Sequence, residues 1–174
     1  MRLASALLGF AALAFAPFTQ AALAAPVSVA PVAVSAELQT ALDEDLGARE
    51  GDVLRRVVAN SVAAALTRHG ATVSDGAALV VEITIVDAAP NRPTMEQLSD
   101  RPGLDMGRSI SIGGAELRGT LRRANGQAIS EINHRRYTNS LVDLTGGEAT
   151  WTDARRAIRQ FAEKVADAYS ANAQ

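Results

Sequence analysis

The sequence contains no cysteine. This absence excludes disulfide bonds, thiol catalysis, thiolate metal sites and attachment of a lipid to a cysteine behind a leader peptide. A domain without disulfides depends on its hydrophobic core for stability, so we expect ordinary globular packing.

An excess of basic charge is also lacking. The formal net charge is −2, and only Lys164 among the 17 basic residues is a lysine. A general nucleic-acid binder would be basic, and in the arginine-rich segment 109–137 only Tyr137 offers a ring on which a base could stack. We therefore expect no nucleic-acid partner. The alanine- and arginine-rich composition fits an exported protein of a Gram-negative bacterium.

Catalytic and metal-binding motifs are absent as well. The two histidines, His69 and His134, fall on different predicted elements, and neither H-x-x-x-H nor G-x-S-x-G occurs. No set of residues converges on one reaction. The sequence predicts a protein that is not an enzyme and that has no cofactor and no metal site.

The N-terminus has the pattern of a secretory signal peptide. Arg2 provides the positive start, residues 3–16 form an apolar run, and Ala22 and Ala24 form the A-x-A cleavage pattern. The run is shorter than the roughly 20 residues that a membrane span needs, although an uncleaved anchor is the alternative. We expect cleavage after Ala24, export to the periplasm and no transmembrane segment in the mature chain. Residues 25–174 then form a single domain.

Local patterns predict the main helices and strands. Residues 27–34 alternate as an edge strand that Pro31 interrupts. A helix begins at Asp52 and stops at Gly70, with His69 in its positively charged last turn. Residues 77–87 form the clearest strand, and a helix capped by Thr152 or Thr150 closes the chain. Residues 35–50 are acidic and irregular, with at most a short helical turn.

Residues 88–108 contain three prolines and two glycines and show no period. A loop of this length is uncommon inside a compact domain and is often functional. We therefore interpret it as an interaction loop, with one helical turn at residues 94–98. Its candidate contact residues are Arg92, Asp100, Arg101 and Asp105. The two aspartates alone do not predict a cation site.

Residues 109–137 predict a β-hairpin. Asn125-Gly126 is the strongest short turn signal, and we place it in a two-residue turn in which both residues have positive φ. This turn would pair Leu121 with Ser130, Gly119 with Ile132, Leu117 with His134 and Arg122 with Ile129. His134 then faces the apolar side as a hydrogen-bonded core histidine.

The double glycine Gly113-Gly114 separates apolar residues at even positions, Ile110 and Ile112, from apolar residues at odd positions. Side chains alternate along a strand, so this change of parity predicts a β-bulge at the glycines. The alternative is an anion-binding nest. A phosphate loop of the P-loop or dinucleotide type is disfavoured because no lysine and no helix follows.

Three arginines of the hairpin, Arg118, Arg122 and Arg135, share the outer face of the predicted sheet. One interpretation is a solvated face with cross-strand salt bridges. The other is a docking face for an anionic partner, either lipid head groups or another envelope protein.

The segments VAAALTRHGATVSDGAALVVEITI and GAELRGTLRRANGQAI resemble a recurring pattern of small envelope proteins. These are the auxiliary lipoproteins of lipid-transport ABC systems and related uncharacterised periplasmic families. The resemblance implies an envelope protein and transfers no catalytic residues to this chain. Many of those proteins carry a lipid-anchoring cysteine that this chain lacks, which puts outer-membrane anchoring in doubt.

The elements together predict an α/β (α+β) fold, a two-layer sandwich. Its sheet is mostly antiparallel with four or five strands, and two helices pack on one face. The function we expect is a non-enzymatic periplasmic adaptor or binding module in cell-envelope maintenance or transport. A lipid or small-ligand carrier and a small hydrolase are the alternatives.

Overall fold

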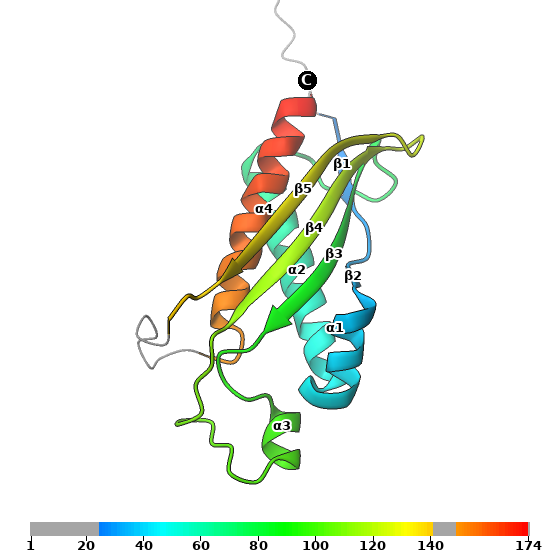
Figure 1. Ribbon diagram of the computed structural model, residues 1–174. Coiled ribbons are helices and arrows are strands. Elements are labelled where there is room, and N and C mark those ends of the chain that lie inside the picture. Colours follow the sequence, from blue (N-terminus) through cyan, green and yellow to red (C-terminus); the bar gives the residue numbers. More distant parts are fainter. Residues whose placement is uncertain (1–24, 141–148, 174) are drawn as a thin grey trace, which may run out of the picture.

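The computed structural model describes residues 25–140 and 149–173 (Figure 1). The predicted signal peptide, residues 1–24, lies outside the described residues. Ala25 lies beside the final helix, because the Tyr169 hydroxyl donates a hydrogen bond of 2.6 Å to the Ala25 carbonyl. No helix of residues 25–140 and 149–173 combines the length and the apolar character that crossing a bilayer requires.

One five-stranded sheet forms the front layer of the molecule in Figure 1. Its strands are β1 (Val27–Val29), β2 (Ala33–Val34), β3 (Leu79–Ala89), β4 (Gly114–Arg123) and β5 (Ala128–Tyr137). The order across the sheet is β1-β3-β4-β5. Strand β2 also pairs with β3, at residues that follow those paired with β1. The long pairs β3–β4 and β4–β5 are antiparallel, whereas the two short strands run parallel to β3. The interrupted edge strand at residues 27–34 is confirmed.

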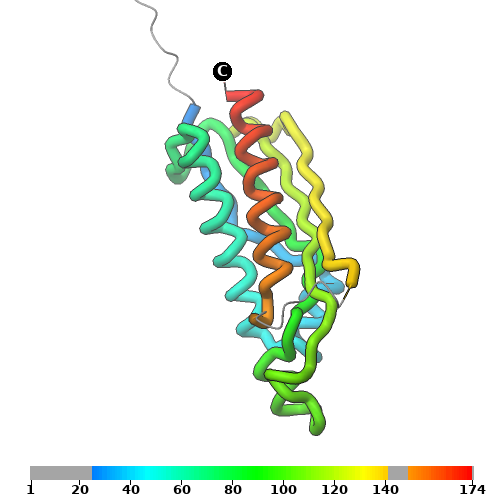
Figure 2. Tube along the Cα trace, turned by 90° about the vertical axis from the view of Figure 1, so that its left-hand side faces the viewer, coloured from blue at the N-terminus to red at the C-terminus, as the bar shows by residue number. Residues whose placement is uncertain are grey.

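Two long helices cover one face of this sheet, as predicted. They are α2 (Ala48–Arg68) and α4 (Thr152–Asn172), which lie side by side in Figure 2. No helix of the described residues covers the other face (Figure 1). The predicted mixed α+β fold, with a mostly antiparallel sheet and two helices on one face, is confirmed.

The acidic segment before α2 is helical, which corrects the prediction of irregular chain. It forms α1 (Ala36–Ala41) and the π-helical turn η1 (Leu42–Leu46). Ser35 caps α1 by accepting a hydrogen bond from the Leu38 amide at 3.1 Å. Leu38, Leu42 and Leu46 are buried at a spacing of four residues, and this burial outweighs the surrounding acidic charge. Helix α2 begins at Ala48 rather than at the predicted Asp52.

The hairpin has the predicted register but a different turn. Leu121 pairs with Ser130 and Leu117 with His134, whereas Arg122 pairs with Ala128 rather than with Ile129. Gly126 has φ of 86°, and no non-glycine residue of the described chain has positive φ. The turn therefore uses three residues followed by a bulge, in which only the glycine needs the left-handed conformation.

The layer between sheet and helices is closely packed. The Phe161 ring of α4 lies on Gly119 of β4, where a Cβ atom would come within 2.9 Å of the ring. Phe161, Ile158 and Tyr169 are fully buried against the sheet. Such close approach of α4 gives no support to a carrier that holds its ligand between sheet and helices.

Candidate functional site

The connection between β3 and β4 stands out at the lower end of the molecule in Figure 1. It runs over residues 90–113, because β3 continues through Ala89 and β4 begins only at Gly114. We call it the connecting segment, and it replaces the predicted loop 88–108. It contains helix α3 (Met95–Asp100), close to the predicted helical turn. The Thr94 hydroxyl caps α3, and the Gln97 side chain completes a capping box.

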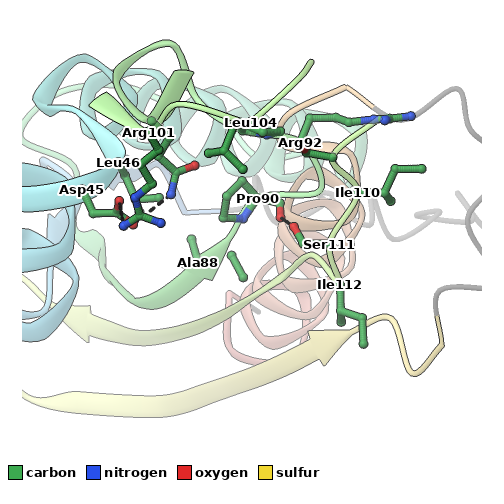
Figure 3. A pocket seen from close by; sticks show the side chains of 14 residues that line it. Asp45, Leu46, Ala88, Pro90, Arg92, Arg101, Leu104, Ile110, Ser111 and Ile112 are labelled. Carbon is green, nitrogen blue, oxygen red and sulfur yellow. Dashed lines mark hydrogen bonds and ion pairs between the residues drawn. The ribbon is translucent and has the colours of Figure 1, made fainter. Parts of the chain in front are cut away.

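A cavity of about 430 Å³ lies between the connecting segment, η1 and the end of β3 (Figure 3). We call it the groove. Its apolar walls are formed by Leu46, Ala88, Pro90, Pro93, Leu104, Ile110 and Ile112. Volumes of about 300–1,000 Å³ are typical of ligand pockets, so the groove is large enough to hold one or two apolar side chains of a partner.

Exposed apolar side chains are concentrated in the connecting segment, and two of them, Ile110 and Ile112, line the groove. Met95, Met106, Ile110 and Ile112 have exposed fractions of 68%, 42%, 38% and 42%. The described residues contain one other large apolar side chain of comparable exposure, Val73. Exposed apolar side chains that adjoin one another typically mark an interaction surface.

The polar residues of the groove fix its walls. Asp45 of η1 forms an ion pair with Arg101 and accepts a hydrogen bond of 2.8 Å from Gln97, so η1 holds the middle and the C-terminal end of α3 (Figure 3). Among the described residues, the charged side chains that line the groove are Asp45, Arg101 and Arg92, and Arg92 is 5% exposed. The Arg92 guanidinium donates a hydrogen bond of 2.7 Å to the Gly107 carbonyl and thereby supports the segment from inside.

The predicted contact residues of the loop therefore have different roles. Arg92 and Arg101 line the groove, whereas Asp105 accepts hydrogen bonds of 2.8 Å from the amides of Gly107 and Arg108 and so shapes a turn. Asp100 lies exposed at the end of α3. Within residues 25–140 and 149–173, no group of three acidic or histidine side chains could hold a metal ion.

A buried hydrogen-bond network joins the connecting segment to α4. Asn91 is fully buried, and its Nδ2 donates a bond of 2.7 Å to the Asp153 carboxylate while its Oδ1 accepts the Asp153 amide at 2.9 Å. Thr138, after β5, donates to the same carboxylate at 2.6 Å, and Arg156 does so at 2.8 Å. Burial acts to raise the pKa of this carboxylate, but these hydrogen bonds outweigh burial and hold the pKa below its ordinary value.

The double glycine belongs to this network, which corrects the bulge prediction. A Cβ atom at Gly113 would lie 2.4 Å from Oδ1 of Asn91, and one at Gly114 would lie 2.3 Å from the Arg136 carbonyl. Ile110 and Ile112 lie outside β4, so no strand changes face at the glycines. Their function is to let the chain pass close to Asn91 and to the end of β5.

The predicted arginine face lies on the open side of the sheet. Arg122 forms an ion pair of 2.7 Å with Glu82, and Arg118 and Arg135 both lie 3.4 Å from Glu116. The Arg135 guanidinium also stacks over the Tyr137 ring at 4.7 Å. The three arginines are thus brought onto one face but alternate with acidic partners, which favours the interpretation as a solvated face. Docking of an anionic partner there stays a prediction.

The two histidines lie on different surfaces. His134 is half-buried, and its Nε2 lies 3.2 Å from the Gln160 amide oxygen. Burial, and to a smaller extent the charge of Lys164, lower the pKa of His134 below the ordinary value. Nδ1 of His69 lies 3.3 Å from Oγ of Ser170, and Nε2 of His69 lies 3.3 Å from Oε2 of Glu163. The Ser170 hydroxyl donates to the carbonyl of Ala166 on its own helix. The contacts of His69 with Ser170 and Glu163 therefore join the end of α2 to α4.

Sequence comparison gives no relatives for this chain. No family model matches, and no curated protein matches. Several solved structures align with it at low similarity. A PelC dodecamer from Paraburkholderia phytofirmans aligns with 13% identity and a TM-score of 0.49, covering 87% of this chain and 90% of that one.

Two further structures align less closely. A minor lipoprotein from Acinetobacter baumannii has 14% identity and a TM-score of 0.39, covering 84% of this chain and 93% of that one. A DUF330 protein from Xanthomonas campestris has 13% identity and a TM-score of 0.39, covering 85% of each chain. At this similarity no function is transferred to the present chain.

Proposed function

We propose that this protein is a non-enzymatic binding module of the cell envelope, and that its groove holds an apolar segment of another envelope protein. The observation that carries the proposal is a preformed cavity of about 430 Å³ whose wall includes the exposed apolar side chains Ile110 and Ile112, within a segment that also exposes Met95 and Met106. The envelope location rests on the signal-peptide pattern of residues 1–24.

The construction of the groove favours a protein segment as its occupant. The walls are apolar, and the Asp45–Arg101 ion pair at one wall offers both a carboxylate and a guanidinium to a peptide backbone. The groove is also partly open to solvent, so a chain can enter it from the surface. Apolar anchors at the centre with polar groups at the rim are the usual arrangement of protein interfaces.

Crosslinking of the tagged protein in living cells tests the proposal. The informative variants are Ile110→Asp and Ile112→Asp, which place a charge in the groove wall. Val73→Asp is the matched control, because Val73 is 37% exposed and does not line the groove. We expect one defined envelope protein to be captured by the wild type and by the control but not by the groove variants. The captured protein is then purified and its affinity for each variant is measured.

A second arm separates the groove from the arginine face. Alanine at Arg118, Arg122 and Arg135 leaves the groove intact, because these side chains lie on the open sheet face. Capture that persists in this triple variant supports the groove. Capture that is lost only in the triple variant would move the docking site to the open face, and unchanged capture by Ile112→Asp would refute the groove.

A further inference from the structure

A second cavity, of about 540 Å³, lies at the end of β5 and the start of α4. We call it the basic cleft. Its walls are formed by Arg135, Arg136, Tyr137, Thr138, Asn139 and Arg156. No acidic side chain lines it among the described residues, in contrast to the groove. Of these wall residues, Arg135 also belongs to the predicted arginine face, whereas Arg136 and Arg156 belong to no predicted site.

Within the described residues, the positive charge of the cleft is only partly neutralised. Arg156 lies 2.8 Å from Asp153, but that carboxylate is 1% exposed and also accepts bonds from Asn91 and Thr138. Arg156 therefore shares this carboxylate with Asn91 and with the cleft residue Thr138.

The other two guanidinium groups have weaker partners. Arg135 lies 3.4 Å from Glu116, which Arg118 approaches at the same distance. Arg136 contacts the neutral amide oxygen of Gln160 at 3.5 Å, and no carboxylate in the described residues forms an ion pair with it. Successive side chains of β5 point to opposite faces of the sheet, so Arg135 reaches the cleft from the open face and Arg136 from the face that α4 covers. Within the described residues, Arg136 thus brings a charge that no carboxylate offsets.

The position of Arg156 adds to this excess. It lies near the N-terminus of α4, where the helix dipole is already positive and where a basic side chain is electrostatically unfavourable. A bound anion would relieve the repulsion from the helix dipole and the repulsion between Arg136 and Arg156, which both lie on the side of the sheet that α4 covers. A guanidinium presents a planar set of N–H donors that matches the oxygens of phosphate and carboxylate.

We infer that the basic cleft binds the phosphate group of a ligand, with Arg136 and Arg156 as its main donors. Phosphate fits better than carboxylate because guanidinium groups from two elements surround one space and can each take an oxygen of a doubly charged, tetrahedral group. The donor set would serve a lipid phosphate head group and a soluble phosphate ester equally. The inference is independent of the partner proposed for the groove.

Titration of the isotopically labelled protein with inorganic phosphate, followed by NMR, tests the inference. We expect saturable shifts of the Thr138 and Asn139 amides and of the Arg136 side chain, with sodium chloride at equal ionic strength giving none. Arg136→Ala should weaken binding about tenfold because one charge-assisted pair is lost. Arg123→Ala is the matched control, because Arg123 lies at the opposite end of β4 and does not line the cleft.

Vesicles distinguish the two sources of phosphate. Sedimentation with phosphatidylglycerol vesicles but not with phosphatidylcholine vesicles, lost in Arg136→Ala, assigns a lipid head group. Saturable phosphate binding without sedimentation assigns a soluble ligand. Shifts that never saturate, or that are identical in Arg136→Ala and the wild type, overturn the inference. Arg156→Ala is not used, since it would leave Asp153 buried without its cation.

Discussion

Nδ2 of Asn91 donates a hydrogen bond of 2.7 Å to the carboxylate of Asp153, and the two residues are 62 positions apart in the chain. Oδ1 of Asn91 accepts the Asp153 amide in return. One side chain thus satisfies both the start of α4 and the buried carboxylate. Because Asn91 opens the connecting segment, this pair fixes how the groove is attached to the rest of the domain.

Replacement of Asn91 by alanine is expected to destabilise the protein by about 2–4 kcal/mol, because a buried amide and carboxylate lose mutual hydrogen bonds and the carboxylate is left partly unsatisfied. Urea unfolding at pH 7 measures this change. Asn60→Ala is the matched control, since Asn60 is exposed on α2, and a change of at most about 0.5 kcal/mol is expected there. Equal values for both variants would show that the network contributes nothing to stability.

The depressed pKa of Asp153 predicts a loss of stability in acid. The folded-state pKa is lower than the unfolded one, so the unfolded chain binds the proton first as the pH falls. The stabilisation is complete above the unfolded pKa of about 4 and is lost as the pH falls towards the folded value. We expect Asp153→Asn to be less stable than the wild type at pH 7 and to show a shallower decline below pH 4. Urea unfolding at a series of pH values measures both, and parallel curves would contradict the prediction.

Elements with a strong local period could be predicted from the sequence. The alternation of Leu79, Val81 and Ile83 determines β3, and the stripe with Ile158 and Phe161 determines α4, because each pattern fits only one backbone geometry. The same rule gives a wrong prediction at Gly113 and Gly114. Ile110 and Ile112 alternate like a strand, but two apolar residues are too few to determine a period, and both remain exposed.

The sequence predicts where the candidate site lies but not which residues form it. The many prolines and glycines marked the connecting segment as a loop, but the groove also needs η1 and the end of β3, which are distant in sequence. Asn91 gave no signal because its partners, Asp153 and Thr138, are brought to it by the fold. The arginines of the basic cleft likewise come from separate elements, β5 and α4, which the fold brings together.

Close packing at Gly119 predicts a specific pair of substitutions. Gly119→Ala would place its Cβ atom 2.9 Å from the buried Phe161 ring, so we expect destabilisation by about 1–3 kcal/mol from overpacking. Phe161→Leu creates space at the same point and should reduce the penalty of the alanine in the double variant. A double-mutant cycle of unfolding free energies measures this coupling. Additive effects would contradict the contact.

The half-buried His134 predicts a titration that depends on Lys164. Burial and the Lys164 charge both disfavour the imidazolium form, so NMR should give His134 a midpoint below the unfolded value of about 6.5. Between these two pKa values the unfolded chain binds a proton that the folded chain does not. This contribution to stability is therefore intact above about pH 6.5 and declines as the pH falls towards the folded pKa.

Removal of the Lys164 charge separates its effect from that of burial. We expect Lys164→Gln to raise the His134 midpoint towards the unfolded value without reaching it, because burial is the larger cause and remains. Arg159→Gln, which removes an exposed charge from the same helix, should leave the midpoint unchanged, since Arg159 does not contribute to the pKa shift of His134. Equal shifts in both variants would mean that His134 responds to the total charge of α4 rather than to Lys164, and the local geometry would then not explain its pKa.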